Sequence, residues 1–465
     1  MFILKINPKK IQQFILIFFL IQSFYNYSQR KIHYEVELSS YVSSETKLPF
    51  WMDANTQGLV RNQDNTGLIF GFDSGFSKQN PNLLDFAVGS TFYGFSSSEK
   101  TKLEINALFA AAQYKKIRLT AGSKHETIRY NGLSSSNGNI IYSGNTRPLP
   151  GISLKTSEFI PILFDGKLSF NAEFGEYFLN DDRFVDDAQM HHKSLSFKII
   201  TSNKSNLTVG VEDFAIWAGT SPELGKLPSG LDDFLRVVGG LSGSGDAPEG
   251  DFINALGNHI GAYRVAYQQH NENTVWEVYW SHPFEDTSGR ELNNIEDGLY
   301  GLYLDFKKPE SILSHLLFEV TYTKNQSGKG QIHGFDDYFN NTIYRSGYTF
   351  FGRSIGSPFF TPAETDENGI TKGVSNNSFI AYHTGFSGKI ANNLHYKTLL
   401  SYSKNDGTKG TPFSNSRNQF SGLLDLNYAT PQLPFSISLG LGVDGGSLLD
   451  DSFGVYVKLF KTGIF

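Results

Sequence analysis

Residues 352–356 read Gly-Arg-Ser-Ile-Gly and match the G-x-S-x-G pattern of a serine hydrolase. In that motif a sharp turn between a strand and a helix exposes the serine hydroxyl beside an oxyanion hole. A Ser-Pro-Phe-Phe stretch follows at 357–360, so the helix that the motif requires is not predicted. The rest of the sequence offers no nucleophile, base and orienting group that belong together. We therefore predict a protein that is not an enzyme, with no catalytic residue and no cofactor.

Two adjacent histidines, His191 and His192, lie close to the acidic stretch 181–187. Such a cluster can be read as a site for a metal ion or an anionic sugar. Adjacent residues in a strand point to opposite faces, however, so the two imidazoles do not readily share one ion. We interpret the segment as a solvated polar loop rim and predict no metal site.

A short amphipathic helix is predicted at 231–238. Leu231, Phe234, Leu235 and Val238 recur at the spacing of one helix face, and two glycines directly afterwards are suited to end the helix. Such a helix can fold inward and narrow a central pore, or it can pack on a rim. The pattern does not separate these two alternatives.

The chain that must position these residues begins with an export signal. Lys5, Lys9 and Lys10 precede an apolar run at 14–21, and polar residues follow up to position 29. This is the layout of a secretory signal peptide, and the run is only about half of the roughly 20 residues that a spanning helix needs. We predict a signal peptide at 1–29, a periplasmic N-terminal segment at 30–52 and a barrel at 53–465.

Beyond the signal, apolar residues recur at every second position. Leu316, Phe318, Val320 and Tyr322 share one face of a strand, and polar residues occupy the other face except for Leu317. Similar alternation is found at 276–280, 300–306 and 424–428. A period of two is that of a β-strand, and a barrel in lipid is apolar on its outer face only. The pattern predicts a transmembrane antiparallel β-barrel in the bacterial outer membrane, with lipid as one partner.

About 18 strands are predicted, an even number as a closed antiparallel bacterial barrel requires. Their spans are 53–61, 66–76, 83–95, 101–113, 116–123, 150–157, 166–176, 193–201, 205–216, 258–271, 273–281, 297–306, 313–324, 376–388, 392–403, 416–428, 435–443 and 452–465.

The connections between these spans sort by parity. Long segments such as 217–257 and 325–375 follow odd-numbered strands, whereas those after even-numbered strands, such as 202–204, are tight. Outer-membrane barrels have short periplasmic turns and long external loops, whereas a secreted β-sandwich has no reason to sort its loops in this way. The early connection at 62–65 is shorter than the rule predicts.

The last predicted strand ends on an aromatic residue. Val455, Val457 and Leu459 share one face, and Phe465 lies on that same face. Outer-membrane proteins commonly end in this way because the assembly machinery recognises an amphipathic final strand. We therefore predict that the assembly machinery recognises the chain through Phe465.

Composition excludes some function classes. The chain has no Cys, so it has no disulfide framework and no thiolate chemistry. Its net charge is -6 and it contains no long basic cluster, so nucleic acid is not a predicted partner. The 40 Phe, 23 Tyr and 46 Gly fit the aromatic girdles and tight turns of a barrel.

Several segments resemble the capsule assembly Wzi family of outer-membrane proteins, and they occur in family order. They are 48–58 (LPFWMDANTQG), 143–151 (SGNTRPLPG), 191–193 (HHK), 231–238 (LDDFLRVV) and 344–358 (YRSGYTFFGRSIGSP). The resemblance implies a large barrel that retains or organises surface polysaccharide as a lectin, without catalysis. It also assigns the serine motif to a family loop with no hydrolase role. Family members can carry a periplasmic helical bundle, for which 30–52 is too short.

Sugar binding requires aromatic faces for stacking and planar polar groups for hydroxyls, both on external loops. The candidate polysaccharide-binding residues are Tyr130, Asn145, Arg147, Arg183, Trp217, Tyr344, Arg345 and Arg353. Two alternatives stay open: a porin or substrate-specific channel, for which a barrel of this size is wide enough, and an outer-membrane hydrolase.

Overall fold

The computed structural model describes residues 31–77, 82–98, 100–245, 248, 255–285, 287–326 and 336–465. The predicted signal peptide at 1–29 lies outside these ranges. Within them, every helix is too short or too polar to cross a membrane.

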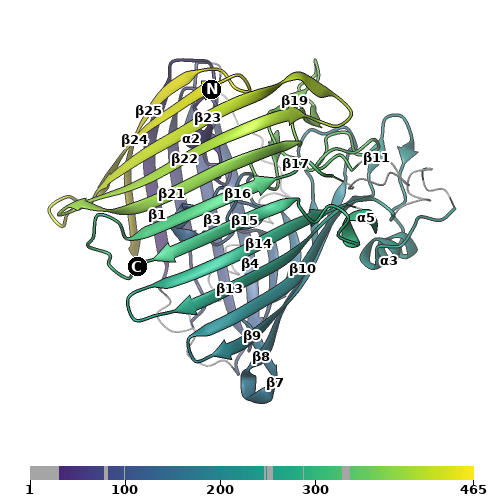
Figure 1. Ribbon diagram of the computed structural model, residues 1–465, viewed down its shortest axis with the longest axis horizontal. Coiled ribbons are helices and arrows are strands. Elements are labelled where there is room, and N and C mark those ends of the chain that lie inside the picture. The colour runs from purple at the N-terminus through teal and green to yellow at the C-terminus, as the bar shows by residue number, and fades with distance from the viewer. Residues whose placement is uncertain are drawn as a thin grey trace, which may run out of the picture.

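One antiparallel sheet closes on itself to form the molecule (Figure 1). It contains nineteen strands, of which β6 and β7 pair with successive parts of β8 and share one position, so the barrel has eighteen positions. β1 pairs with β25 from His33↔Ile464 to Ser43↔Gly454 and closes the ring. The strands are β1 (His33–Ser43), β2 (Asn65–Asp73), β3 (Asp85–Ser96), β4 (Thr101–Tyr114), β5 (Ile117–Ser123), β6 (Gly151–Thr156), β7 (Ile160–Leu163), β8 (Leu168–Phe178), β9 (Gln189–Ser202), β10 (Ser205–Trp217), β13 (Asn258–His270), β14 (Val275–Phe284), β15 (Gly298–Asp305), β16 (His315–Tyr322), β21 (Phe379–Ala391), β22 (Leu394–Gly407), β23 (Pro412–Tyr428), β24 (Ser436–Gly446) and β25 (Ser452–Ile464).

The predicted alternation is confirmed by burial. On β16 the side chain of Phe318 is 50% exposed, whereas its neighbours Leu317 and Glu319 are 0% and 2% exposed. Exposed apolar side chains continue around the barrel on Leu68, Val278 and their equivalents. They form the outer, lipid-facing belt that a barrel requires. Each of the eighteen positions pairs with the position on either side, so the sheet is closed as a barrel in lipid must be.

The prediction of a first strand at 53–61 is wrong. A short helix, α2 (Phe50–Asp53), begins that region, and Trp51 and Met52 are buried against the inside of the barrel. The segment 30–52, which we expected in the periplasm, instead contributes β1 to the barrel wall. On β1, Val36, Leu38 and Val42 are exposed with the same period of two. The other seventeen predicted spans each overlap an observed strand, and β1 completes the predicted total of about eighteen.

With β1 as the first strand, the short connection predicted at 62–65 is no longer an exception to the alternation of long and short connections. The connection from β1 to β2 runs from 44 to 64 and is long, as the rule requires for the external end. The other long external connections are 124–150, 218–257 and 323–378, whereas 115–116, 203–204 and 392–393 are tight periplasmic turns.

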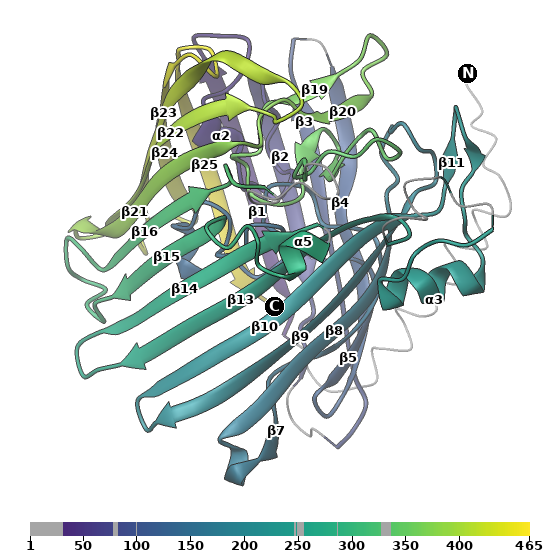
Figure 2. The same cartoon turned by 45° about the vertical axis from the view of Figure 1, so that its right-hand side comes forward.

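Three external connections fold largely into the barrel (Figure 2), although residues 364–370 of the third stay mostly exposed at the external end. We call residues 44–64, 124–150 and 336–378 together the plug. Loop residues such as Leu133, Ile140 and Tyr338 are completely buried, and they share one apolar core with inward-facing wall residues. The third segment carries two small hairpins, β17 (Thr349–Phe350) with β18 (Arg353–Ser354), and β19 (Ala363–Thr365) with β20 (Thr371–Val374). The hydrophobic core of this protein therefore lies inside the barrel at its external end.

The connection 218–257 behaves differently. It contains the small hairpin of β11 (Thr220–Ser221) and β12 (Gly225–Lys226), followed by the predicted helix, α3 (Leu231–Gly239). Both figures show α3 outside the ring of strands. Of the two alternatives that the sequence left open, packing at the rim is the one observed. The next external connection carries the one-turn helix α5 (Thr287–Arg290).

Candidate functional site

Carboxylates on the inner face of the wall fasten the plug. Glu319 of β16 accepts hydrogen bonds from Ser134 Oγ at 2.6 Å, from Ser135 N at 2.7 Å and from Tyr279 OH at 2.5 Å. Glu212 of β10 accepts from Asn139 Nδ2 at 2.6 Å. A buried carboxylate is costly unless such donors compensate it. The 124–150 segment is therefore held by groups that the barrel wall positions.

Glycines of neighbouring strands make room for the inward-facing tyrosines. A Cβ added at Gly301 would lie 2.0 Å from Cζ of Tyr279, and one at Gly440 would lie 2.1 Å from Cζ of Tyr456. The ring of Tyr279 can therefore lie flat across β15 and bring its hydroxyl to Glu319.

The three plug segments also bind one another. Asp53 and Arg353 form an ion pair, and Asn55 Nδ2 donates to the carbonyl of Ser135 at 2.7 Å. His125 Nδ1 lies 2.5 Å from Gln57 Oε1. Burial lowers the pKa of His125 to about 4, so the imidazole is neutral at physiological pH. The segments thus form one connected body inside the barrel.

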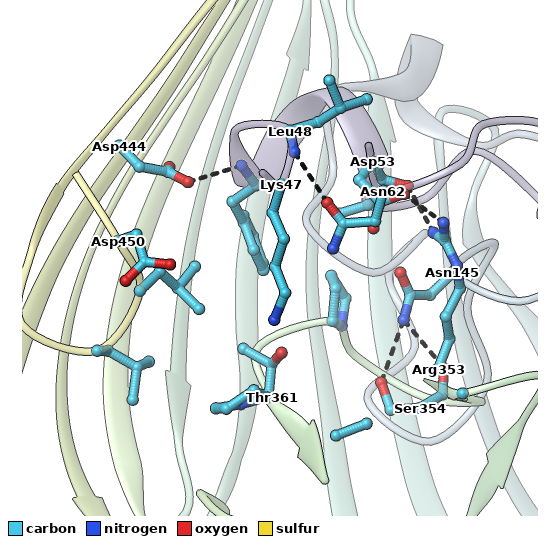
Figure 3. A pocket seen from close by; sticks show the side chains of 18 of the residues that line it. Lys47, Leu48, Asp53, Asn62, Asn145, Arg353, Ser354, Thr361, Asp444 and Asp450 are labelled. Carbon is cyan, nitrogen blue, oxygen red and sulfur yellow. Dashed lines mark hydrogen bonds and ion pairs between the residues drawn. The ribbon is translucent and has the colours of Figure 1, made fainter. Parts of the chain in front are cut away.

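A cleft of about 430 Å³ lies on this body, between the plug and the wall at β24 and β25 (Figure 3). Four stretches of chain line it: 45–62, 352–363, 444–452 and Asn145. The lining residues are Glu45, Lys47, Leu48, Phe50, Asp53, Ala54, Asn62, Asn145, Gly352, Arg353, Ser354, Pro358, Phe360, Thr361, Pro362, Ala363, Asp444, Leu448, Leu449, Asp450 and Ser452.

The cleft combines charged, amide and apolar groups. Asp444 Oδ2 accepts from Phe50 N at 2.8 Å, and Asn62 Oδ1 accepts from Leu48 N at 3.1 Å, so both side chains are held in place. Lys47 and Asp450 are exposed, and their side chains make no hydrogen bond or ion pair with the residues that the structure describes. A fixed polar wall with free charged groups at its mouth is suited to a ligand rich in hydroxyl groups.

A family model described as capsule assembly protein Wzi matches residues 21–386 of the chain. The chain belongs to this family. The resemblance found in the sequence is thereby confirmed. As a family member with a closed, apolar-belted barrel, the protein is an outer-membrane β-barrel.

Among solved structures, the barrel is similar to that of Wzi from Escherichia coli, an outer-membrane protein involved in group 1 capsule assembly and described as a carbohydrate-binding β-barrel. The two are 13% identical with a TM-score of 0.54, over 92% of this chain and 84% of the other. OprD of Pseudomonas aeruginosa gives 10% identity and a TM-score of 0.49 over 94% and 95% of the two chains. OccAB2 of Acinetobacter baumannii gives 10% and 0.49 over 94% and 98%. These likenesses concern the fold. No curated protein sequence matches the chain.

The structure brings two of the eight predicted binding residues to the cleft. Asn145 Nδ2 donates to the carbonyl and hydroxyl oxygens of Ser354 at 3.1 and 3.2 Å. Arg353 also donates to the carbonyl of Val60 at 2.9 Å. Both side chains therefore shape the cleft, while most of their polar groups are already engaged within the plug.

Three others lie at the rim or in the plug, where Arg183 and Tyr344 are buried and Arg147 is partly buried. Arg147 pairs with Glu104 at 2.5 Å, Arg183 pairs with Asp181 at 3.0 Å, and the hydroxyl of Tyr344 donates to the carbonyl of Ala218 at 3.3 Å. Arg345 is exposed and paired with Glu223 at 2.5 Å, and Trp217 lies outside the barrel beneath α3.

Tyr130 borders a second cavity, of about 350 Å³, in the lumen beneath the plug. Its hydroxyl donates to Glu277 at 2.7 Å, and its ring stacks on that of Tyr279 with centroids 4.9 Å apart. Lys198 and Arg264 also line this cavity.

Sequence reasoning missed Lys47, Asn62, Asp444 and Asp450. The first two were overlooked because the neighbouring stretch was assigned to a periplasmic segment and a strand. Asp450 belongs to a short connection, 447–451, whereas the predicted binding residues all lie on connections predicted to be long. The acidic pair Asp450-Asp451 between the last two strands was the signal that could have drawn attention to it.

The two histidines lie on β9 and are only 0% and 6% exposed, so the interpretation of this segment as a solvated loop rim is wrong. They face opposite sides of the strand, as expected for adjacent strand residues. His191 Nδ1 lies 2.6 Å from Glu176 Oε1 on the outer face, and His192 stacks on Phe214 inside, with centroids 4.0 Å apart. Over the described part of the chain, no three His, Asp or Glu side chains gather in a way that could hold a metal ion.

Proposed function

We propose that this barrel binds surface polysaccharide at its external cleft and thereby serves capsule or exopolysaccharide assembly. Membership of the capsule assembly family supports the process, and the E. coli structure is described as carbohydrate-binding. The observation that carries the proposal is the plug: a barrel that fills its external end with its own loops presents a binding surface instead of a pore.

The chemistry of the cleft fits a glycan. Carboxylates and amides accept and donate hydrogen bonds to vicinal hydroxyls, and Leu448, Leu449 and Pro358 offer apolar surface for the C–H faces of sugar rings. Lys47 and Asp450 stand free at the cleft, so a ligand need not break an existing ion pair to reach them. A single site of this kind gains affinity from repetition along a polymer.

The serine motif supports a role without catalysis. Ser354 is 2% exposed, and its hydroxyl lies 2.9 Å from the carbonyl of Ser357, to which it donates. It lies in the two-residue strand β18, with no helix after it among residues 355–378. The strand-turn-helix geometry of a nucleophile is therefore replaced by a plug contact.

Three measurements test the proposal. Titration of purified surface polysaccharide against the protein in detergent should show saturable binding, and single-channel recordings in a planar bilayer should be silent. Deletion of the gene should release polysaccharide from the cells while its secretion continues. A large steady conductance with no glycan binding would instead identify a porin or substrate channel.

Export and assembly complete the proposal. We propose that residues 1–29 are a cleaved signal peptide and that the assembly machinery recognises the final strand through Phe465. That side chain is 78% exposed, beyond the last residue of β25.

A further inference from the structure

Helix α3 packs against the outside of the barrel wall with only part of its apolar face. Val237 is completely buried there, and the ring of Phe234 lies against those of Trp217 at 5.6 Å and His191 at 5.9 Å between centroids. Lys193 of β9 donates to the carbonyl of Val237 at 3.4 Å. The helix is thereby fixed to the outer surfaces of β9 and β10.

The rest of the apolar face is exposed. Leu231 and Leu235, one turn apart, are 75% and 58% exposed. With about 100° per residue, these leucines point roughly 110° away from the direction of Phe234 and Val237. The remaining arc is polar and carries the ion pair of Asp232 with Arg236 at 2.8 Å. The helix therefore has three distinct sides: one on the barrel, one apolar and exposed, and one charged.

The wall beside α3 belongs to the lipid-facing belt. Phe174 on β8, Leu195 on β9 and Val211 on β10 are all about 40% exposed on the outer face. Two residues further toward the external end, Lys193 pairs with Asp213 at 2.7 Å. α3 thus lies where the belt gives way to charged groups, which is the level of the membrane interface.

We propose that α3 lies flat in the outer-leaflet interface and inserts Leu231 and Leu235 among the lipid acyl chains. A helix that lies beside a barrel at the membrane surface contacts the barrel, lipid and water on three different sides, and the three sides of α3 match these surroundings. The helix also adjoins the belt directly, because the ring of Phe234 contacts that of the belt residue Phe174, with centroids 6.4 Å apart. The ends are fixed as well: Asp233 accepts from Gly230 N at 2.8 Å, and Gly240 ends the helix in the left-handed region at φ 61°.

The absence of native Cys allows a direct test with single-cysteine variants. The full-length protein is reconstituted in phosphatidylcholine vesicles that contain lipids with a nitroxide near the upper end of one acyl chain. A bimane label at Leu235→Cys should be quenched severalfold more strongly than the same label at Asp232→Cys, on the charged side of the helix. A label at Phe318→Cys, in the belt, gives the reference for full lipid contact.

Equal quenching at Leu235→Cys and Asp232→Cys would overturn the proposal. So would shielding of the Leu235→Cys label only after polysaccharide or a second protein is added, because α3 would then be a docking surface for that partner. Heat-modifiable migration on gels confirms that each variant is a folded barrel before its quenching is read. Neither outcome depends on the proposed glycan cleft.

Discussion

Arg353 and Asp53 form an ion pair that joins two plug segments 300 residues apart in the chain. The guanidinium also donates to the carbonyl of Asp53 at 2.7 Å. Both side chains are less than one fifth exposed. Through this pair α2 and the hairpin of β17 and β18 are fastened to each other at the edge of the cleft.

Loss of Arg353 should loosen the plug. Arg353→Met leaves Asp53 buried without its partner, which typically costs about 3–5 kcal/mol. We expect flickering conductance in planar bilayers and faster proteolysis within 336–378, while the barrel itself stays folded. The double variant Asp53→Asn with Arg353→Met removes the unpaired charge and should recover part of the loss. A single variant as silent and as protease-resistant as the parent would show that the pair does not hold the plug.

Removal of Glu319 should detach a different segment. Glu319→Ala deprives Ser134, Ser135 and Tyr279 of their acceptor, and hydrogen bonds to charged groups contribute about 1.5–3 kcal/mol each. Amide hydrogen exchange across 124–150 should accelerate at least roughly 100-fold. The bonds to Ser134 and Ser135 contribute about 3 kcal/mol even at the lower value, and each 1.4 kcal/mol corresponds to a factor of ten. Glu310→Ala, at an exposed periplasmic turn, is the matched control. Unchanged protection in the Glu319 variant would contradict the assigned role.

Stability should depend on pH through Asp297, at the external end of β15. Burial raises the pKa of this carboxyl to about 6, although Tyr338 and the backbone amides of Asn325 and Gln326 donate to it. An acid with a raised folded-state pKa binds more protons when folded, so stability falls as pH rises from about 4 to about 6. The expected loss is about 3 kcal/mol from this group.

The measurement is urea unfolding in lipid vesicles at several pH values, with Asp297→Asn as the comparison. Subtracting the variant's pH dependence from that of the parent removes the contributions of other groups, including His125. A difference that stays constant between pH 4 and 7 would rule out the raised pKa.

The cleft should lose affinity when its free charged groups are removed. Lys47→Ala combined with Asp450→Ala should weaken polysaccharide binding about tenfold, equivalent to about 1.4 kcal/mol. Arg345→Ala removes an exposed charge of the rim outside the cleft lining and should leave binding unchanged. Isothermal titration with the same polysaccharide distinguishes the two variants. If Arg345→Ala proves the more damaging, the glycan binds at the rim and not in the cleft.

Phe465 should matter for assembly more than for folding. Its ring stacks on that of Tyr34 with centroids 4.4 Å apart, and its amide donates to the carbonyl of Ile32 at 2.9 Å. Phe465→Ala should reduce the amount of protein in the outer membrane severalfold, while refolding in detergent changes little. Phe164→Ala, at an equally exposed aromatic of the periplasmic end, is the control. Equal membrane levels of both variants would remove the proposed role in recognition.

Much of the barrel could be predicted because each strand carries its own signal. Phe318 beside Glu319, and Val278 beside Glu277, show in a single strand which face meets lipid. β1 was missed although Val36 and Leu38 alternate in the same way, because its span was assigned to the periplasm. The pairing of β1 with β25 joins opposite ends of the barrel sequence, and local sequence patterns do not predict such a long-range pair.

The plug could not be predicted from local pattern. Ser134 and Ser135 read as exposed loop residues, and only the position of Glu319, on a strand far along the chain, explains their burial. Arg147 and Arg183 were selected as available cations for the same reason, and each has a carboxylate partner instead. The sequence of a long loop does not show whether its polar side chains are buried and paired or free to bind a ligand, because that depends on the surface that encloses the loop.

The seam between β1 and β25 sets a condition on biogenesis. Because the wall is completed only when the earliest strand meets the latest one, the growing sheet has two unsatisfied edges until translocation of β25 is finished. Either edge is then a template for pairing with another chain. We therefore expect that slowed export of this chain favours its aggregation in the periplasm.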